Sequence, residues 1–127
     1  MDILREMADL IEESGGGSII NIASMMGMFG PDLSNYEGTD MGIPPPDYFF
    51  HRAGIINLTR YLARIYAGKN IRVNCVSPGG LFNNQPERFL ENYNKKVPLG
   101  RMANNDDIKG LMVLLASDAG AYINGEN

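Results

Sequence analysis

Three polar residues occupy places at which α/β enzymes put reacting groups. Ser24 directly follows an apolar run at residues 18–23, and Tyr48 opens a helical pattern that has Arg52 four residues later. This spacing puts the tyrosine and the arginine one turn apart on the same helix face. A phenol has a pKa of about 10, and a cation fixed beside it favours the phenolate. With a hydroxyl donor nearby, this pair could move a proton to or from an alcohol or carbonyl oxygen.

Ser24 and Tyr48 also have purely structural interpretations. A serine after a strand commonly caps a turn, and Tyr48 could anchor the helix start together with the two phenylalanines that follow it. His51, the only histidine, could act as a general base. On a helix, however, it is rotated by about 100° from Arg52, which favours a surface or subunit-contact role.

A second candidate site follows the apolar run at residues 71–76, which is typical of a parallel strand covered on both faces. The run leads into Pro78-Gly79-Gly80, where the proline fixes φ and the glycines permit close backbone approaches. In open α/β sheets, ligands lie just past the carboxyl ends of the strands. We therefore expect a ligand-binding turn here.

Hydrophobic spacing and turn residues predict the elements that must hold these side chains. The predicted order is a helix over 2–14, a strand over 18–23, a loop over 25–46, a helix over 47–67, a strand over 71–76, a short helix over 86–93 and a final helix, capped by Asn104 or Asn105, that ends near 117. In the long helix, Ile55, Leu58, Leu62 and Ile65 are predicted to form one buried face. A loop of about twenty residues in a compact domain is often functional.

This order of elements predicts an α/β fold with a parallel sheet and crossover helices. A sheet of two strands leaves one edge of each strand unpaired and its faces poorly covered. We therefore expect residues 1–127 to form a single partial domain. One missing strand is expected beside residues 18–23 and another after Asn127.

Composition excludes several classes of function. The 127 residues carry a net charge of −4 with scattered basic residues, which argues against nucleic acid as a partner. No apolar run is long enough to span a membrane. Cys75, the single cysteine, is expected to be a buried hydrophobe in a reducing compartment, the cytoplasm. Asp106 and Asp107 suit a helix N-terminus better than a metal pair, so no metal site is expected.

The segments GGGSIINIAS, YFFHRAGIINLTRYLA, IRVNCVSPGG and PLGRMANNDDIKGLMVLLASDAGAYINGEN, in this order, resemble the C-terminal half of short-chain dehydrogenases/reductases. The resemblance implies the C-terminal half of a doubly wound, Rossmann-like domain. It also implies catalytic roles: Ser24 would polarise the substrate oxygen and Tyr48 would exchange the proton. Arg52 stands where the family has a lysine that binds the nicotinamide ribose.

The same resemblance implies a cofactor, NAD or NADP. Tyr48 and Arg52 would contact it, and the turn at Pro78 and Gly79 would lie against it. Leu81 falls where the family's backbone holds the carboxamide of the nicotinamide, and Asn83 takes the place of a common cofactor-binding threonine. The family's glycine-rich phosphate loop would lie before residue 1, so we expect weak or no cofactor binding by this chain alone.

The resulting prediction is the substrate-side half of an NAD(P)-dependent oxidoreductase that interconverts a secondary alcohol and a ketone. The insert before Tyr48 is most similar to a subgroup associated with sugar or surface-polysaccharide modification. The alternative is a non-catalytic truncated remnant or a helix-mediated interaction module, and the arginine at position 52 favours it. A homo-oligomer is expected in either case. Met25, Met26, Met28 and Phe29 could line an apolar substrate pocket or simply pack under the insert.

Overall fold

The computed structural model of the protein describes residues 2–127. Its elements in chain order are α1 (Asp2–Glu13), β1 (Gly17–Ile22), the 3-10 turns η1 (Met25–Gly27) and η2 (Leu33–Asn35), α2 (Pro46–Ile65), β2 (Ile71–Val76), α3 (Glu87–Asn94), α4 (Lys109–Ala116) and the 3-10 turn η3 (Asp118–Gly120). The order of helices and strands agrees with the sequence pattern. Within the described residues, no helix is both long and apolar enough to cross a membrane.

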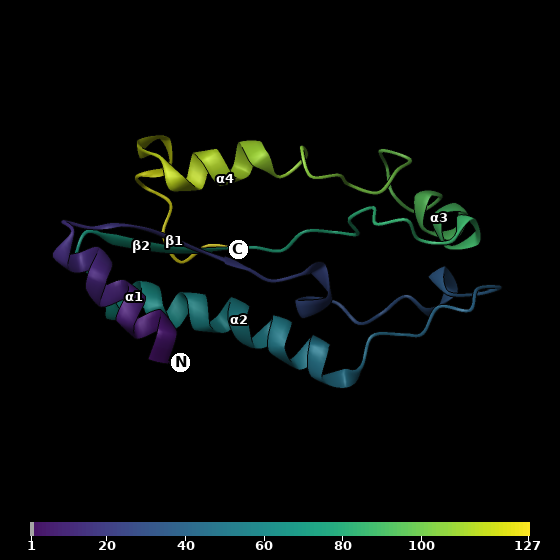
Figure 1. Cartoon of the computed structure of the whole chain (residues 1–127), viewed down its shortest axis with the longest axis horizontal. Coiled ribbons are helices and arrows are strands. Elements are labelled where there is room, and N and C mark those ends of the chain that lie inside the picture. The colour runs from purple at the N-terminus through teal and green to yellow at the C-terminus, as the bar shows by residue number, and fades with distance from the viewer. Residues whose placement is uncertain (1) are drawn as a thin grey trace.

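The two strands form a parallel sheet between two layers of helices. Their register runs from Gly17 opposite Ile71 to Ile22 opposite Val76. Helices α1 and α2 lie on one face of this sheet and α4 on the other, as Figure 1 shows. Helix α3 and the loop after β1 extend beyond the carboxyl ends of the strands (Figure 1). The predicted α/β fold with crossover helices is confirmed.

The core lies between the sheet and helices α1 and α2. Val73 is completely buried at its centre, with Ala8 of α1 and Leu62 of α2 packed around it. The buried face of α2 differs from the prediction in part: Ile56, Thr59, Leu62 and Ala63 are buried, Ile55 and Leu58 are half-buried, and Ile65 is 50% exposed. The aromatic ring of Tyr66, buried just after the helix ends, fills the place predicted for Ile65.

The outer edge of β2, expected to be free, is hydrogen-bonded to the segment after α4. Gly125 N donates to Val73 O, and Glu126 O accepts from Cys75 N, both at 2.8 Å. The buried side chain of Asn74 donates to Ile123 O and accepts from Glu126 N. Because these groups satisfy the exposed backbone of β2, the sheet edge on this side is covered.

The final helix begins at Lys109, later than predicted, because side chains stabilise a turn before it. Asn104 Oδ1 accepts from Asp106 N, while Asp107 accepts from Asn104 N and forms a two-pronged ion pair with Arg101 at 2.6 and 2.7 Å. Such side-chain bonds to backbone compete with helix formation. The hydrogen bonds from Arg101 also hold the pKa of the Asp107 carboxyl below its usual range. The Asp107 carboxylate thus stabilises this turn. The sequence had predicted instead that it would lie at the helix N-terminus.

Candidate active site

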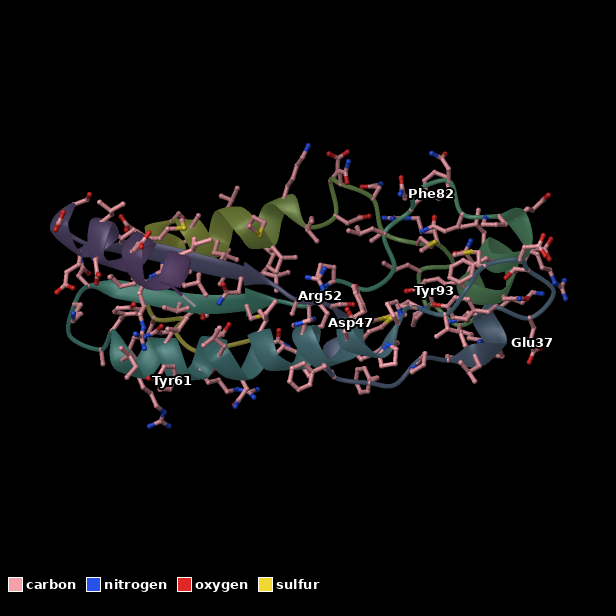
Figure 2. All side chains as sticks on the ribbon, turned by 60° about the horizontal axis from the view of Figure 1, so that its bottom comes forward. Glu37, Asp47, Arg52, Tyr61, Phe82 and Tyr93 are labelled. Atoms are coloured by element: carbon pink, nitrogen blue, oxygen red, sulfur yellow. The ribbon has the colours of Figure 1, made fainter. Side chains whose placement is uncertain are left out.

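A cavity of about 360 Å³ lies at the carboxyl ends of the two strands, bounded by the start of α2 and by α3. Six of the seven predicted site residues line it: Ser24, Tyr48, Arg52, Pro78, Gly79 and Leu81. Figure 2 shows Arg52 of α2 and Tyr93 of α3 pointing into the region between these helices. Residues from four separate segments of the chain therefore meet in one cavity.

Ser24 is buried at the point where β1 passes into η1. Its backbone is extended, and its Oγ accepts a hydrogen bond from Met26 N at 3.2 Å, which caps the 3-10 turn. A hydroxyl has one proton to donate as well as lone pairs to accept. Because the bond to Met26 uses only acceptor capacity, the serine proton is free for an oxygen atom in the cavity.

The turn that carries Ser24 is pressed against α2 through a glycine. A Cβ atom at Gly27 would lie 2.7 Å from the carbonyl carbon and oxygen of Arg52, which is too close for any other residue. The main chain of η1 can therefore approach the main chain of α2 directly. This close approach brings the serine turn to the part of the helix that carries the tyrosine and the arginine.

Tyr48 and Arg52 lie one turn apart on α2, as their spacing predicted. The helix starts with Pro46 in its first turn, a position that suits proline because its missing N–H has no helical acceptor there. The guanidinium carbon of Arg52 lies 4.9 Å from the centre of the Tyr48 ring. Arg52 Nη1 also donates to Ile22 O at 2.8 Å. The arginine thus joins the tyrosine to the end of β1.

The Pro78-Gly79-Gly80 turn is held by groups on its two sides. Met25 N donates to Pro78 O at 3.0 Å, and Gly80 N donates to the Tyr93 hydroxyl at 2.7 Å. A Cβ atom at Gly80 would lie 2.7 Å from that hydroxyl. The glycine is therefore required for the tyrosine to reach the turn. The turn forms one wall of the cavity, as the sequence predicted.

Asn83 is the predicted site residue that the structure does not bring to this cavity. Its backbone N donates to Gln85 Oε1 at 2.7 Å, and Gln85 Nε2 in turn donates to Leu81 O at 2.9 Å. Gln85 lines the cavity instead. These bonds fold residues 81–85 into a tight loop, which turns the asparagine outward.

Several residues that line the cavity were not identified from the sequence. Tyr93 and Phe89, four residues apart on α3, are both buried, and Tyr36 packs edge-on against Phe89. The four-residue spacing of the two aromatics on a short helix was the available signal. Burial raises the pKa of the Tyr36 hydroxyl, and the nearby Tyr48 adds to this effect. The cavity is therefore a partly desolvated environment.

A family model described as enoyl-(acyl carrier protein) reductase matches residues 1–127. A crystal structure of a short-chain dehydrogenase from Leptospira borgpetersenii, with bound NAD+, superposes with a TM-score of 0.89 at 40% identity and covers 98% of this chain. The chain belongs to the short-chain dehydrogenase/reductase family. Its place in that family confirms the Rossmann-like fold class.

Two curated proteins are also similar to this chain. The flagellin modification protein A of Campylobacter coli is 37% identical over 96% of this chain. The 2-dehydro-3-deoxy-D-gluconate 5-dehydrogenase of Escherichia coli is 33% identical over 91% of it. The chain spans less than half of these proteins, 47% and 44%, and 47% of the Leptospira chain.

Proposed function

We propose that this chain forms the substrate-side half of an NAD(P)-dependent oxidoreductase that interconverts a secondary alcohol and a ketone. The observation that carries the proposal is the meeting of Ser24, Tyr48 and Arg52 in one cavity beside the Pro-Gly-Gly turn. These residues come from a strand end and a helix start that are 24 positions apart in the sequence. Their convergence supports a catalytic role over three unrelated structural roles.

The geometry supports a distinct task for each side chain. The Ser24 hydroxyl, with its proton free, donates a hydrogen bond to the substrate oxygen and holds it in the cavity. The Tyr48 hydroxyl gives a proton to that oxygen in ketone reduction and takes one from it in alcohol oxidation. The positive charge of Arg52 stabilises the negative charge that develops on the tyrosine as its proton leaves.

The residues around the cavity fit the nicotinamide end of NAD or NADP. A guanidinium carries five N–H donors, and the bond to Ile22 uses one of them, so Arg52 keeps donors for ribose hydroxyls. Pro78, Gly79 and Leu81 provide the opposing backbone wall. When bound, the cofactor would accept or supply the hydride. Residues 1–127 contain no glycine-rich phosphate loop, so the diphosphate would need groups outside them.

We further propose a small alcohol or ketone as substrate, with sugar-related compounds included. The name of one relative, a dehydrogenase of a sugar acid, supports this range. The buried free thiol of Cys75 supports a reducing compartment, and we place the protein in the cytoplasm. Neither a nucleic acid nor a membrane is among the proposed partners.

A fusion protein gives the direct test. In it, residues 1–127 follow the nucleotide-binding half of the Leptospira relative, with which this chain superposes at a TM-score of 0.89. The fusion protein is expected to reduce small ketones with NADH or NADPH. The Tyr48→Phe variant should lose about 100- to 10,000-fold in turnover, the usual contribution of a general acid. Equal turnover in this variant and the parent fusion would refute the proposed role of Tyr48.

The second candidate, a helix-mediated interaction module, rests on the apolar surface of α1. Ile3 is 73% exposed and Leu10 is 63% exposed, and Met7 lies between them. Exposed apolar groups at this spacing favour pairing with another helix, and we propose a homo-oligomer. The fusion protein separates the two candidates: an interaction module would associate without turning over ketones.

A further inference from the structure

We propose that a second cavity beside the candidate active site binds an apolar ring or alkyl chain of the substrate. This inference deepens the proposed function, on which it rests, by naming a substrate class: ketones and alcohols with an apolar group near the reacting carbon. The second cavity, here called the apolar subsite, has a volume of about 260 Å³. An engineered apolar cavity of about 150 Å³ holds a benzene molecule, so this one accepts a larger group.

Most residues that line the apolar subsite are apolar, and its polar lining residues are Asp32, Asn35 and Lys96. Met25, Met26 and Phe29 contribute from the segment after β1, and Tyr93 and Val97 from the region of α3. Methionine side chains are flexible and adapt to irregular apolar ligands. The pocket interpretation of these methionines is supported for Met25 and Met26, whereas Met28 is not among the lining residues.

The charged residues that line the apolar subsite, Asp32 and Lys96, are already paired. Lys96 Nζ contacts Asp32 Oδ2 at 2.7 Å, Asn35 Oδ1 at 2.8 Å and Ser34 Oγ at 2.5 Å. Three acceptors satisfy the three donors of an ammonium group. Because this charge is neutralised within the protein, the subsite offers no free cation to a carboxylate or phosphate. An uncharged apolar group is the ligand that its chemistry favours.

The apolar subsite adjoins the candidate active site. Met25, Met26 and Tyr93 line both cavities. The Tyr93 hydroxyl is also held against the Pro-Gly-Gly turn, through its bond to Gly80 N. The Tyr93 hydroxyl donates to Met25 Sδ at 3.9 Å, so these two side chains form a common wall of the two cavities. A substrate with its oxygen at Ser24 and Tyr48 would place its apolar part in the subsite once the flexible Met25 side chain turns aside.

Binding of 2-octanone and 2-butanone to the chain tests this subsite without requiring catalysis. The methyl groups of the methionines are labelled with carbon-13, and their NMR shifts are followed during titration. A buried methylene increases affinity roughly fourfold. 2-Octanone has four more methylenes than 2-butanone. Because the subsite is partly open to solvent, these methylenes are only partly buried, and 2-octanone should bind at least about tenfold more tightly than 2-butanone. The Met25 and Met26 signals should shift, and that of exposed Met7 should not.

A matched pair of glycine variants makes the test specific. A Cβ atom at either Gly30 or Gly42 would meet nothing within 4 Å, so both sites accept a larger residue. Only Gly30 is among the lining residues of the apolar subsite. Gly30→Leu should abolish the preference for 2-octanone, and Gly42→Leu should retain it. If the methionine signals show an unfolded chain, the same titration is made on the fusion protein.

The outcomes separate this inference from the proposed function. Tight 2-octanone binding that Gly30→Leu abolishes supports the subsite, even if the fusion protein proves inactive and the proposed function fails. Equal affinity for both ketones overturns the subsite, whatever the activity. Shifts at Met7 as large as those at Met25 also overturn it, because they indicate general binding to exposed apolar surface.

Discussion

The guanidinium of Arg52 lies over the ring of Tyr48, with its central carbon 4.9 Å from the ring centre. The same guanidinium donates to Ile22 O, so it is fixed at two points. An arginine in this position supplies positive charge next to the tyrosine but does not release a proton. Replacing Arg52 therefore tests whether the residue at this position limits turnover.

Arg52→Lys is expected to raise turnover of the fusion protein by roughly three- to tenfold, which corresponds to about 1 kcal/mol in the barrier. A lysine ammonium fits between ribose hydroxyls and can pass a proton onward, which a guanidinium does not. Steady-state kinetics with a small ketone measure the effect. Arg60→Lys, an exposed position on the same helix, serves as the control. A lower turnover for Arg52→Lys would identify the arginine as adapted to this site.

Tyr93→Phe is expected to destabilise the fusion protein by about 1–3 kcal/mol, because it leaves Gly80 N without its hydrogen-bond partner. The Michaelis constant for the cofactor should rise as well, since the Pro-Gly-Gly turn loses its support. Urea unfolding and initial rates measure the two effects. Tyr122→Phe, at a fully exposed side chain, should change neither. Identical behaviour of both variants would contradict the positioning role of Tyr93.

The parallel strands and the one-turn spacing of Tyr48 and Arg52 could be predicted from periodicity in the sequence. The meeting of Ser24 with this pair was implied by the resemblance to short-chain dehydrogenases/reductases. The role of Tyr93 could not be predicted from the sequence, because its hydrogen bond to Gly80 depends on how α3 packs over the Pro-Gly-Gly turn. The outward position of Asn83 was also unforeseen, since it follows from the two hydrogen bonds of Gln85.

The covered edge of β2 and the start of α4 also could not be predicted from local sequence patterns. The covered edge of β2 depends on Asn74 and on backbone bonds from a segment about fifty residues later, which has no strand-like alternation. The late start of α4 depends on the ion pair of Arg101 with Asp107, which competes with a simple helix cap. Specific polar contacts, both near and far in the sequence, therefore decided what hydrophobic patterns left open.

The carboxyl of Asp32 predicts a pH dependence of stability. Its pKa falls from 3.8 to about 2, chiefly because Lys96 and then Ser34 donate hydrogen bonds to it. A folded-state pKa below the unfolded value gives stability that is complete above about pH 4 and is lost as the pH falls to about 2. The melting temperature of Asp32→Asn should therefore approach that of the wild type between these values. The exposed Asp40→Asn is the control, and a difference that stays constant with pH would contradict the argument.

Cofactor binding by residues 1–127 alone is expected to be no tighter than about millimolar. A helix N-terminus that cradles the diphosphate supplies much of dinucleotide recognition, and the glycine run at 15–17 leads into β1 rather than into a helix. Calorimetric titration with NADH and NADPH measures the affinity, with the fusion protein as the positive control. Micromolar binding by the chain itself would show that other groups hold the cofactor.

Self-association of the chain is expected because apolar groups remain exposed on both sides of the sheet. Leu10 on α1 and Val113 on α4 are 63% and 67% exposed. Among residues 2–127, the sheet contains only β1 and β2, so the edge of β1 that faces away from β2 has no strand beside it. An unpaired strand edge is a site of association. Size-exclusion chromatography with light scattering is expected to show a dimer or larger species.

The position of the contact can be tested with single charges. Leu10→Glu should shift the population toward monomer, because a carboxylate buried between two helices is strongly unfavourable. Leu33→Glu introduces the same charge at another exposed apolar position, in η2 and away from α1, and should leave the population unchanged. A compact monomer with a sharp thermal transition in the unmodified chain would show that the two strands, the covered edge of β2 and the contacts of the two helix layers suffice. In that event the exposed surface of α1 needs no partner, and the homo-oligomer proposal is wrong.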